Sequence, residues 1–469
     1  MRAFNSRPAR SVALRIASPQ CRTFAATSRR AQVLDATTLP DRITPKYLPS
    51  PGSLLLSLHW AQPPRNILLI PKLHASQATH SAVAFAKHLK ANYPGLNILF
   101  EARIAHSVHE AVPFPVYTST YPASVFPQKI DLVATLGGDG TILRAASLFS
   151  VQESVPPILA FSMGTVGFLG EWKFEEYKRA WREVYMSGSG VPVEDLQAPH
   201  TRIAAGQWDD LQASEEAAGL PSGWDAVRGK SMGPQRACKM LLRHRLKVGL
   251  HDEQGQNVNR ELIPTATARA YQMPNMPGMT PAKRPNPPSI HAINELLIHR
   301  GPHPHLAIID IYLNNHFLTE AVADGILVST PTGSTAYSLS SGGSIIHPLV
   351  KSLLITPICP RSLSFRPLVL PLNTKVSLKL SEKNRGRDLE VSIDGKRRAA
   401  ARIGMEVRVE GETVGKGSDG SWRGGVPCVI RVPSRGETEG ISEDDDGWVG
   451  GLNGLLKFNY PFGETPSGS

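Results

Sequence analysis

Residues 131–141 read DLVATLGGDGT, and this stretch decides the fold class of the chain. Residues 131–136 have the length and apolar character of a buried parallel strand, and residues 142–146 are typical of a first helical turn. Glycines between a strand and a helix leave backbone N–H groups bare at a sheet edge, where phosphate oxygens can bind. Asp139 lies among these glycines. The stretch indicates phosphate chemistry; the alternative is a tight turn in which Asp139 only caps the helix.

The first half of the chain repeats this alternation of strand and helix. A helical pattern through Ala82, Phe85 and Leu89 follows the first strand-like run. Such alternation predicts a parallel sheet that is covered by helices on both faces. The predicted strands, besides 131–136, are 66–70, 96–100 and 157–161.

The second half has a different sequence pattern, in which glycine- and proline-rich turns separate short strand-like runs. This pattern predicts a mainly β domain. The predicted strands are 241–248, 306–313, 375–380 and 390–393. The fold class is therefore an α/β N-terminal domain with a parallel sheet, followed by a mainly-β C-terminal domain.

Five segments follow from these patterns. We expect the α/β domain at 60–185 and the mainly-β domain at 190–430. Within the latter, residues 251–289 contain seven prolines and little periodicity, so we expect a disordered insertion there. Residues 206–235 are polar and are expected to be a second surface insertion. A C-terminal tail, 431–469, is expected to pack back on the N-terminal domain.

The basic charge of the chain is concentrated at its N-terminus. Residues 1–30 contain seven arginines, no lysine and no acid, so without them the net charge of +11 falls to +4. This argues against a nucleic-acid-binding surface on the folded part. Residues 1–34 are Arg- and Ser-rich and acid-free, which predicts a transit peptide for import into the mitochondrial matrix; the alternative is a disordered basic tail. Because no apolar stretch approaches about 20 residues, no membrane span is expected.

Three further motifs narrow the chemistry. An Asn294-Glu295 pair follows an apolar approach, and residues 324–343 form a long run rich in threonine, glycine and serine that contains TPTGSTAYSLS. The last motif is Asp394-Gly395, which is a hairpin turn or a ligand contact. Together with the GGDGT stretch, this ordered set resembles the NAD kinase family, and the resemblance covers most of residues 60–400.

The resemblance implies ATP-dependent phosphorylation of NAD or NADH at the 2′-hydroxyl of the adenosine ribose. Asp139 is the expected catalytic residue, as the group that accepts or orients the hydroxyl proton or as a metal organiser. Mg²⁺ or another divalent cation is expected with ATP, and its ligands are not predicted. The residues expected to bind the nucleotides are Gly137, Gly138, Gly140, Thr141, Phe168, Asn294, Glu295, Asp324, Thr335, Ala336, Tyr337, Ser338 and Ser340.

Two other functions stay open on the sequence. The GGDGT stretch is shared with diacylglycerol and sphingosine kinases, although a lipid kinase leaves residues 324–343 unexplained. A non-catalytic NAD(P) sensor is the second alternative, which the intact Asp139 disfavours. The expected partners are ATP, NAD and NADH, with no nucleic acid and no membrane, and we expect a homo-oligomer. A matrix enzyme that supplies NADPH is expected to accept NADH at least as well as NAD.

Overall fold

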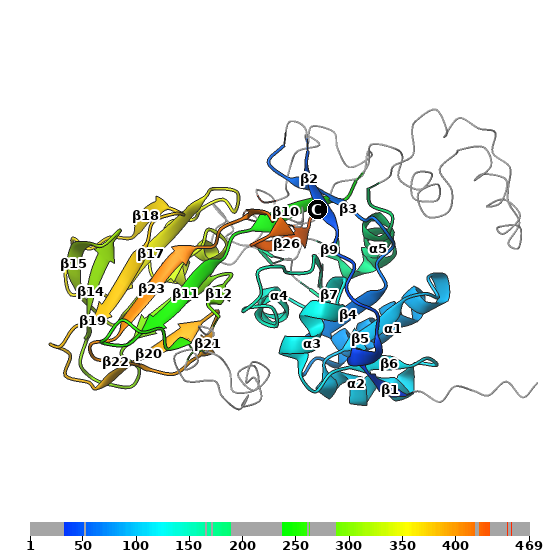
Figure 1. Ribbon diagram of the computed structural model, residues 1–469, viewed down its shortest axis with the longest axis horizontal. Helices are drawn as coiled ribbons and strands as arrows, with labels where there is room; N and C mark the ends of the chain where they lie inside the picture. The colour runs from blue at the N-terminus through cyan, green and yellow to red at the C-terminus, as the bar shows by residue number, and fades with distance from the viewer. Residues whose placement is uncertain are drawn as a thin grey trace, which may run out of the picture.

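The computed structural model consists of an α/β domain and a β domain that lie side by side (Figure 1). It describes residues 32–50, 53–164, 167–169, 172–188, 237–259, 262, 288–417, 422–431, 448 and 452. No helix among these residues is long and apolar enough to cross a membrane. The two-domain fold class predicted from the sequence is confirmed.

An eleven-stranded sheet forms the centre of the first domain, with the order β1-β6-β5-β4-β7-β8-β26-β10-β3-β2 and β9 beside β8. Pairing is parallel from β1 through to β26 and antiparallel from β26 to β2. The strands are β1 (Val33–Asp35), β2 (Lys46–Pro49), β3 (Leu56–His59), β4 (Asn66–Pro71), β5 (Asn97–Phe100), β6 (Val116–Thr118), β7 (Leu132–Leu136), β8 (Ile158–Ser162), β9 (Trp172–Lys173), β10 (Lys239–Arg243) and β26 (Val426–Val429).

Helices cover both faces of this sheet because the side chains on both faces of its central strands are mostly apolar. Every residue of β4, β7 and β8 is buried. One face packs against α1 (Ser76–Asn92), α2 (Ala102–Val108) and α5 (Tyr177–Tyr185). The other face packs against α3 (Pro122–Lys129) and α4 (Asp139–Ser147). This is the parallel, doubly covered sheet that the strand–helix alternation predicts.

The second domain is a sandwich of two antiparallel sheets around one apolar core. One sheet has the order β12-β11-β23-β19-β14-β15 and the other β18-β17-β16-β13-β20-β21, with β22 paired to β20. The strands are β11 (Leu246–His251), β12 (Ile290–Ala292), β13 (Glu295–His299), β14 (Ala307–Leu313), β15 (His316–Ala323), β16 (Gly325–Ser329), β17 (Ser352–Ile358), β18 (Leu368–Pro371), β19 (Val376–Leu380), β20 (Asp388–Ile393), β21 (Lys396–Arg397), β22 (Ala401–Arg402) and β23 (Glu406–Gly411). A small hairpin of β24 (Gly415–Lys416) and β25 (Trp422–Arg423) follows.

The domain boundaries differ from those expected. The run 241–248 is two strands in two sheets, because the chain leaves the first sheet after β10 and enters the sandwich at β11. After the sandwich, β26 returns to the first sheet. The mainly-β segment 190–430 therefore contributes two strands to the α/β domain. Tertiary pairing decides this, since nothing in the local pattern tells which sheet a strand joins.

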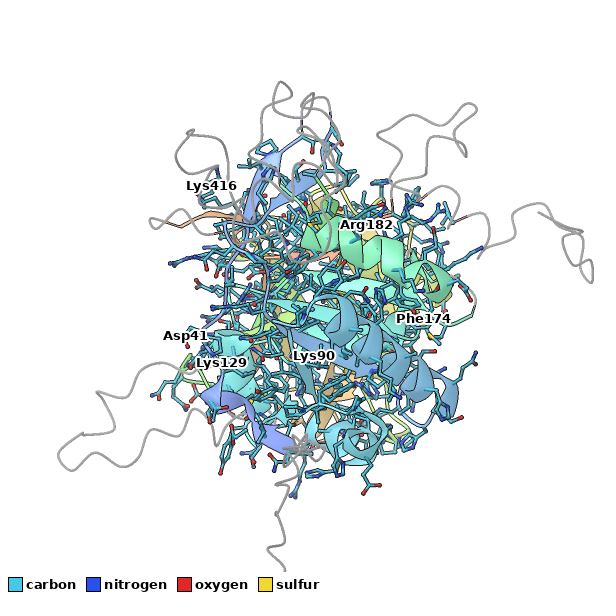
Figure 2. All side chains as sticks on the ribbon, turned by 90° about the vertical axis from the view of Figure 1, so that its right-hand side faces the viewer. Asp41, Lys90, Lys129, Phe174, Arg182 and Lys416 are labelled. Atoms are coloured by element: carbon cyan, nitrogen blue, oxygen red, sulfur yellow. The ribbon has the colours of Figure 1, made fainter. Side chains whose placement is uncertain are left out.

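The α/β domain also begins earlier than residue 60. β1 pairs with β6, so it overlaps the end of the expected leader 1–34. The segment after it is fastened by buried Asp131, whose carboxylate accepts hydrogen bonds from the backbone N–H groups of Ile43, Arg65 and Asn66. Lys129 reaches Asp41 at 2.7 Å, and both residues are labelled in Figure 2. The leader is therefore limited to residues before Val33.

The expected insertion 251–289 also starts too early. His251 ends β11, Asn259 is fully buried, and Leu262 lies in the sandwich core. The remaining residues to 287, and the expected insertion 206–235, lie outside the described residues. In the tail, the ring of Trp448 contacts His347 of the β domain, with 4.6 Å between centroids. Arg431, the first residue of the tail, forms an ion pair with Glu176 of the α/β domain at 2.9 Å, so the expected packing of the tail on that domain stays a prediction.

Candidate active site between the domains

The glycine turn connects the carboxyl end of β7, a central strand of the first sheet, to α4. Gly137 donates its N–H to the carbonyl of Phe161 in β8, and an added Cβ would lie 2.3 Å from Thr141 Oγ1. Gly138 and Gly140 instead have no atom within 4 Å of an added Cβ. The turn is thus closed on the side of buried Thr141 and open at Gly138 and Gly140, where an anion can approach the N-terminus of α4.

Asp139 holds a second backbone segment against this turn. Its two carboxylate oxygens accept hydrogen bonds from the N–H groups of Phe168 and Leu169, each at 3.1 Å. An added Cβ on Gly167 would lie 2.1 Å from Asp139 Oδ1, so a larger residue does not fit there. Phe168 therefore meets the site through its backbone. Because each carboxylate oxygen has two lone pairs, Asp139 can still accept a proton or contact a cation.

The Asn294-Glu295 pair starts β13 in the second domain, and Asp394 positions it. The Asp394 carboxylate accepts hydrogen bonds from the N–H groups of Ile293, Asn294 and Glu295 at 3.0, 2.7 and 3.2 Å. Asp394 and Gly395 have φ angles of 47° and 69°, as a type I′ hairpin turn requires. Asp394 is thus both a turn residue and the support of the Asn-Glu pair, so neither expected role describes it fully.

Two acceptors of this pair are buried and unpaired. Asn294 Oδ1 and Glu295 Oε2 have no hydrogen-bond partner among the described residues. Burial, and then the nearby Asp394 carboxylate, raise the pKa of Glu295 to about 7. Buried polar groups without partners are rare and call for an explanation. A ligand that donates hydrogen bonds to both side chains supplies one.

The Thr/Gly/Ser run packs directly on this pair. Thr330 donates from its N–H to the carbonyl of Asn294 and from its hydroxyl to that of Ile293, at 2.8 and 2.6 Å. An added Cβ on Gly333 would lie 2.2 Å from the Asn294 carbonyl oxygen. The run continues as a 3₁₀ turn (Thr332–Thr335) and the short helix α9 (Tyr337–Ser340). These contacts explain why the run needs small residues.

The side chains of the 3₁₀ turn and of α9 differ in their exposure to solvent. Tyr337 and Ser340 are exposed, and Thr335 and Ala336 are half-buried. Ser338 is fully buried, and its hydroxyl lies 2.8 Å from that of Thr356 in β17. The Ser338 hydroxyl therefore supports the fold of this segment, and the expected contact of Ser338 with a nucleotide stays a prediction.

Arg243 brings the two halves of the site together, and the sequence analysis missed it. One guanidinium nitrogen donates to the carbonyl of Phe168 at 3.2 Å, and another lies 3.5 Å from Thr332 Oγ1. Arg243 is 2% exposed. The loop held by Asp139 is thereby linked to the Thr/Gly/Ser run of the other domain. The available signal was the basic triplet 243–245 within an otherwise apolar run.

In a single copy of the chain, Asp324 lies apart in space from this site. It precedes β16, and β16 pairs antiparallel with β13, so Glu295 faces Ser329 while His299 faces Gly325. Five strand residues at about 3.3 Å each separate Asp324 from the Asn-Glu pair. Asp324 instead forms an ion pair with Arg300 at 2.6 Å. One chain therefore does not bring Asp324 together with the other site residues, and its contact with the dinucleotide stays a prediction.

The site has two parts. The α/β domain supplies the glycine turn, which can accept an anion, and the Asp139 carboxylate. The β domain supplies the unpaired acceptor oxygens of Asn294 and Glu295. That combination defines a phosphotransferase that acts on a nucleotide. Among the described residues, no three histidine, cysteine, aspartate or glutamate side chains gather to hold a metal ion.

Comparison with known proteins agrees with this class. Residues 67–189 match the family model of the ATP-NAD kinase N-terminal domain, and residues 293–413 match that of its C-terminal domain. The chain is 35% identical to the mitochondrial NADH kinase of Schizosaccharomyces pombe over 91% of this chain and 85% of that protein. For the mitochondrial NADH kinase of Saccharomyces cerevisiae, the identity is 30% over 89% and 86%.

A solved structure agrees as well. The crystal structure of yeast NADH kinase complexed with NADH matches with a TM-score of 0.65 and 29% identity, covering 92% of this chain and 99% of that one. The chain therefore belongs to the ATP-NAD kinase family. The lipid-kinase alternative is wrong.

Proposed function

We propose that this protein transfers the γ-phosphoryl group of ATP to the 2′-hydroxyl of the adenosine ribose of NAD or NADH, which gives NADP or NADPH and ADP. The observation that carries the proposal is the link through Arg243, which joins the loop bound to Asp139 in one domain to the Thr/Gly/Ser run of the other. Family membership and the similarity to NADH kinases support the same reaction.

The residues divide into two groups by domain. Gly138 and Gly140 would bind ATP phosphates through their backbone, and Asp139 would accept or orient the ribose hydroxyl proton. Asn294 and Glu295 would receive hydrogen bonds from the dinucleotide, since their acceptor oxygens are buried and unpaired. Thr335, Ala336, Tyr337 and Ser340, on the turn after β16, would complete the dinucleotide side.

A divalent cation such as Mg²⁺ would neutralise charge on the transferred phosphoryl group. Asp139 fits such an ion, because its carboxylate lies at the open glycine turn and keeps a lone pair on each oxygen after its two hydrogen bonds. Its expected roles as proton acceptor and as metal organiser both remain proposals.

The decisive experiment is a product assay. Purified residues 32–469 with ATP, Mg²⁺ and NAD or NADH should form NADP or NADPH, detected with an NADP-specific dehydrogenase. Binding of NAD without product would favour the non-catalytic sensor instead. Formation of ADP without NADP(H) would also contradict the proposal.

We further propose that the protein acts in the mitochondrial matrix. Two similar proteins are named mitochondrial NADH kinases, and the acid-free, arginine-rich leader agrees with import. A fluorescent fusion of residues 1–32 should enter the matrix, and a version with its seven arginines replaced by glutamine should not. A cytosolic signal from the unchanged leader would contradict this location.

A further inference from the structure

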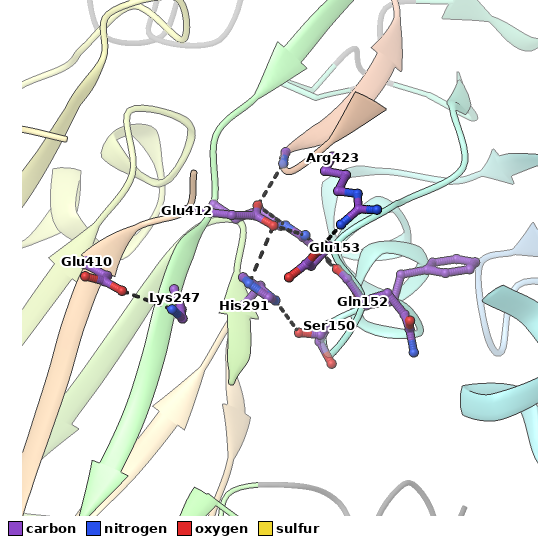
Figure 3. Close-up of polar contacts among 11 residues, drawn as sticks. Ser150, Gln152, Glu153, Lys247, His291, Glu410, Glu412 and Arg423 are labelled. Carbon is purple, nitrogen blue, oxygen red and sulfur yellow. Dashed lines mark hydrogen bonds and ion pairs between the residues drawn. The ribbon is translucent and has the colours of Figure 1, made fainter. Parts of the chain in front are cut away.

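A buried ion pair lies where the chain crosses between the domains. Arg245, in the link from β10 to β11, donates two hydrogen bonds to Glu412 at 2.7 and 2.5 Å. The two side chains are 2% and 5% exposed. Glu412 follows β23, where the chain starts back toward the first domain, and it also accepts the N–H of Gly425 at 2.7 Å. The pair thus joins both crossing segments (Figure 3).

The same cluster holds the turn that follows α4. Arg245 donates to the carbonyls of Phe149 and Gln152 at 3.2 and 2.8 Å. His291 of β12 donates its backbone N–H to the carbonyl of Ser150 at 2.7 Å, and its ring lies 3.5 Å from Glu412. Two strands of the β domain are thereby attached to the C-terminal end of α4.

Both apolar and polar contacts join the domains on this side, since Val151 packs against the sandwich core and Ile293 packs against the cluster that contains α4. A cavity of about 400 Å³ opens beside the cluster, and residues of both domains line it, among them Glu153, His291 and Glu412. Lys396 of the β domain adds another attachment, because its ammonium group contacts the hydroxyl of Ser147 in the last turn of α4. The apolar contacts hold this helix near the β domain, and these directional hydrogen bonds fix its orientation.

Helix α4 connects this cluster to the proposed active site. Asp139 is its first residue, and Ser147 its last. At about 1.5 Å per residue the helix is roughly 12 Å long and behaves as a rigid rod. A shift at its C-terminal end therefore moves Asp139 relative to Asn294 and Glu295, which belong to the β domain.

We propose that Arg245 and Glu412 are positioning residues, which hold α4 so that Asp139 meets a ribose hydroxyl bound by the β domain. This inference rests on the proposed function. In that function ATP phosphates contact the glycine turn and the dinucleotide contacts mainly the β domain, so each substrate keeps most of its own contacts when the domains shift. Misalignment therefore lowers kcat and leaves both KM values nearly unchanged.

A charge-free double variant separates positioning from stability. Arg245→Met alone leaves the buried Glu412 carboxylate unpaired, which destabilises the fold. Arg245→Met/Glu412→Leu removes both charges, and such replacements of buried ion pairs often keep or improve stability. The hydrogen bonds to Phe149 and Gln152 stay absent in the double variant, so any loss of positioning remains.

The matched control lies two residues along the same strand pair. Lys247 and Glu410 form an ion pair at 3.1 Å between β11 and β23, and their side chains are 45% and 37% exposed. Both residues belong to the β domain. Lys247→Met/Glu410→Leu therefore makes the same chemical change on the same strands without touching the turn after α4.

The test measures kcat, both KM values and melting temperature. We expect Arg245→Met/Glu412→Leu to melt near the wild type with kcat lower by roughly 10- to 100-fold, the loss expected from a misplacement of about 1 Å. Each KM should stay within about threefold, and the control should match the wild type. Wild-type kcat in the double variant would overturn the inference. An inactive wild type would instead refute the proposed function.

A milder variant covers the case in which the double variant does not fold. Glu412→Gln keeps the shape of the side chain and one acceptor oxygen for Arg245, so it loosens the cluster without removing it. We expect kcat to fall by about 3- to 10-fold with both KM values unchanged. This corresponds to an increase of about 1 kcal/mol in the activation free energy. An unchanged kcat, or a fall explained by a higher KM, would overturn the inference.

Discussion

Glu295 is the described site residue whose charge state depends most directly on the fold around it. Burial and the neighbouring Asp394 carboxylate raise its pKa from 4.5 to about 7. Between those pH values the folded protein keeps a proton that the unfolded chain has lost. Because the folded state binds more protons there, this group makes the free energy of unfolding fall as pH rises from about 4.5 to about 7.

Replacing Glu295 with glutamine tests this sign. Glutamine does not titrate, so Glu295→Gln should gain free energy of unfolding relative to the wild type as pH rises through that window. Urea unfolding of both proteins at pH 5 and pH 7.5 measures the difference, and the titration of groups that do not interact with Glu295 cancels in it. Parallel pH dependence of the two proteins would show that Glu295 is not protonated in the fold.

Asp139 is the residue on which turnover should depend most. Asp139→Asn removes the proton acceptor, so kcat should fall by about 10²–10⁴-fold. The substitution also places an amide NH₂ against one of the N–H groups of Phe168 and Leu169, so a small local loosening is expected. ATP affinity and melting temperature serve as controls and should change little. Turnover near that of the wild type would contradict the assignment.

At the scale of elements, a buried asparagine closes the base of the expected insertion. Asn259 accepts the N–H of Leu250 at 2.7 Å and donates to the carbonyl of Pro288 at 3.2 Å. It therefore ties the end of β11 to the start of β12. Leu262, 1% exposed, adds an apolar contact to the sandwich core.

This arrangement limits which part of the insertion can be replaced. A Gly/Ser linker in place of residues 264–286 should be tolerated, because that proline-rich segment has little apolar periodicity. A replacement of residues 255–285, which removes Asn259 and Leu262, should lower the free energy of unfolding by about 3–6 kcal/mol. Chemical denaturation of the two variants gives both values. Equal stabilities would mean that the buried pair contributes nothing.

At the scale of the whole molecule, the proposed matrix location predicts the preferred substrate. The inner mitochondrial membrane blocks exchange of NADPH, so a matrix kinase that phosphorylates NADH supplies NADPH directly. We therefore expect kcat/KM for NADH to be at least as high as for NAD. Steady-state kinetics with both dinucleotides measure this discrimination. A strong preference for NAD would refute the NADH proposal and leave the kinase assignment in place.

The expected homo-oligomer also belongs to this scale and remains a prediction. Phe317, Leu318 and Val369 are large apolar side chains, exposed by 58, 42 and 51%. They lie on β15 and β18, which are the edge strands of the two sandwich sheets. An exposed apolar edge is a natural place for contact with a second copy.

Much of the fold follows from local pattern alone. Runs such as 67–70 and 132–136 are apolar at nearly every position, as a strand that is buried on both faces requires, so the parallel sheet could be predicted. The glycine turn and the Asn-Glu pair could also be recognised, because few residue types satisfy their backbone geometry and their acceptor chemistry. These features depend on neighbours in the chain.

Other features depend on partners that are distant in the chain, and only the tertiary structure decides them. The run 241–248 is uniformly strand-like, yet it divides at His244-Arg245 because its two halves pair with β26 and β23, each more than 150 residues away. The same long-range pairing buries Arg243 and Arg245, gives Asp394 its supporting role and separates Asp324 from the site. Hydrogen bonding across sheets and the cost of an unpaired buried charge act through space, so no local pattern reveals them.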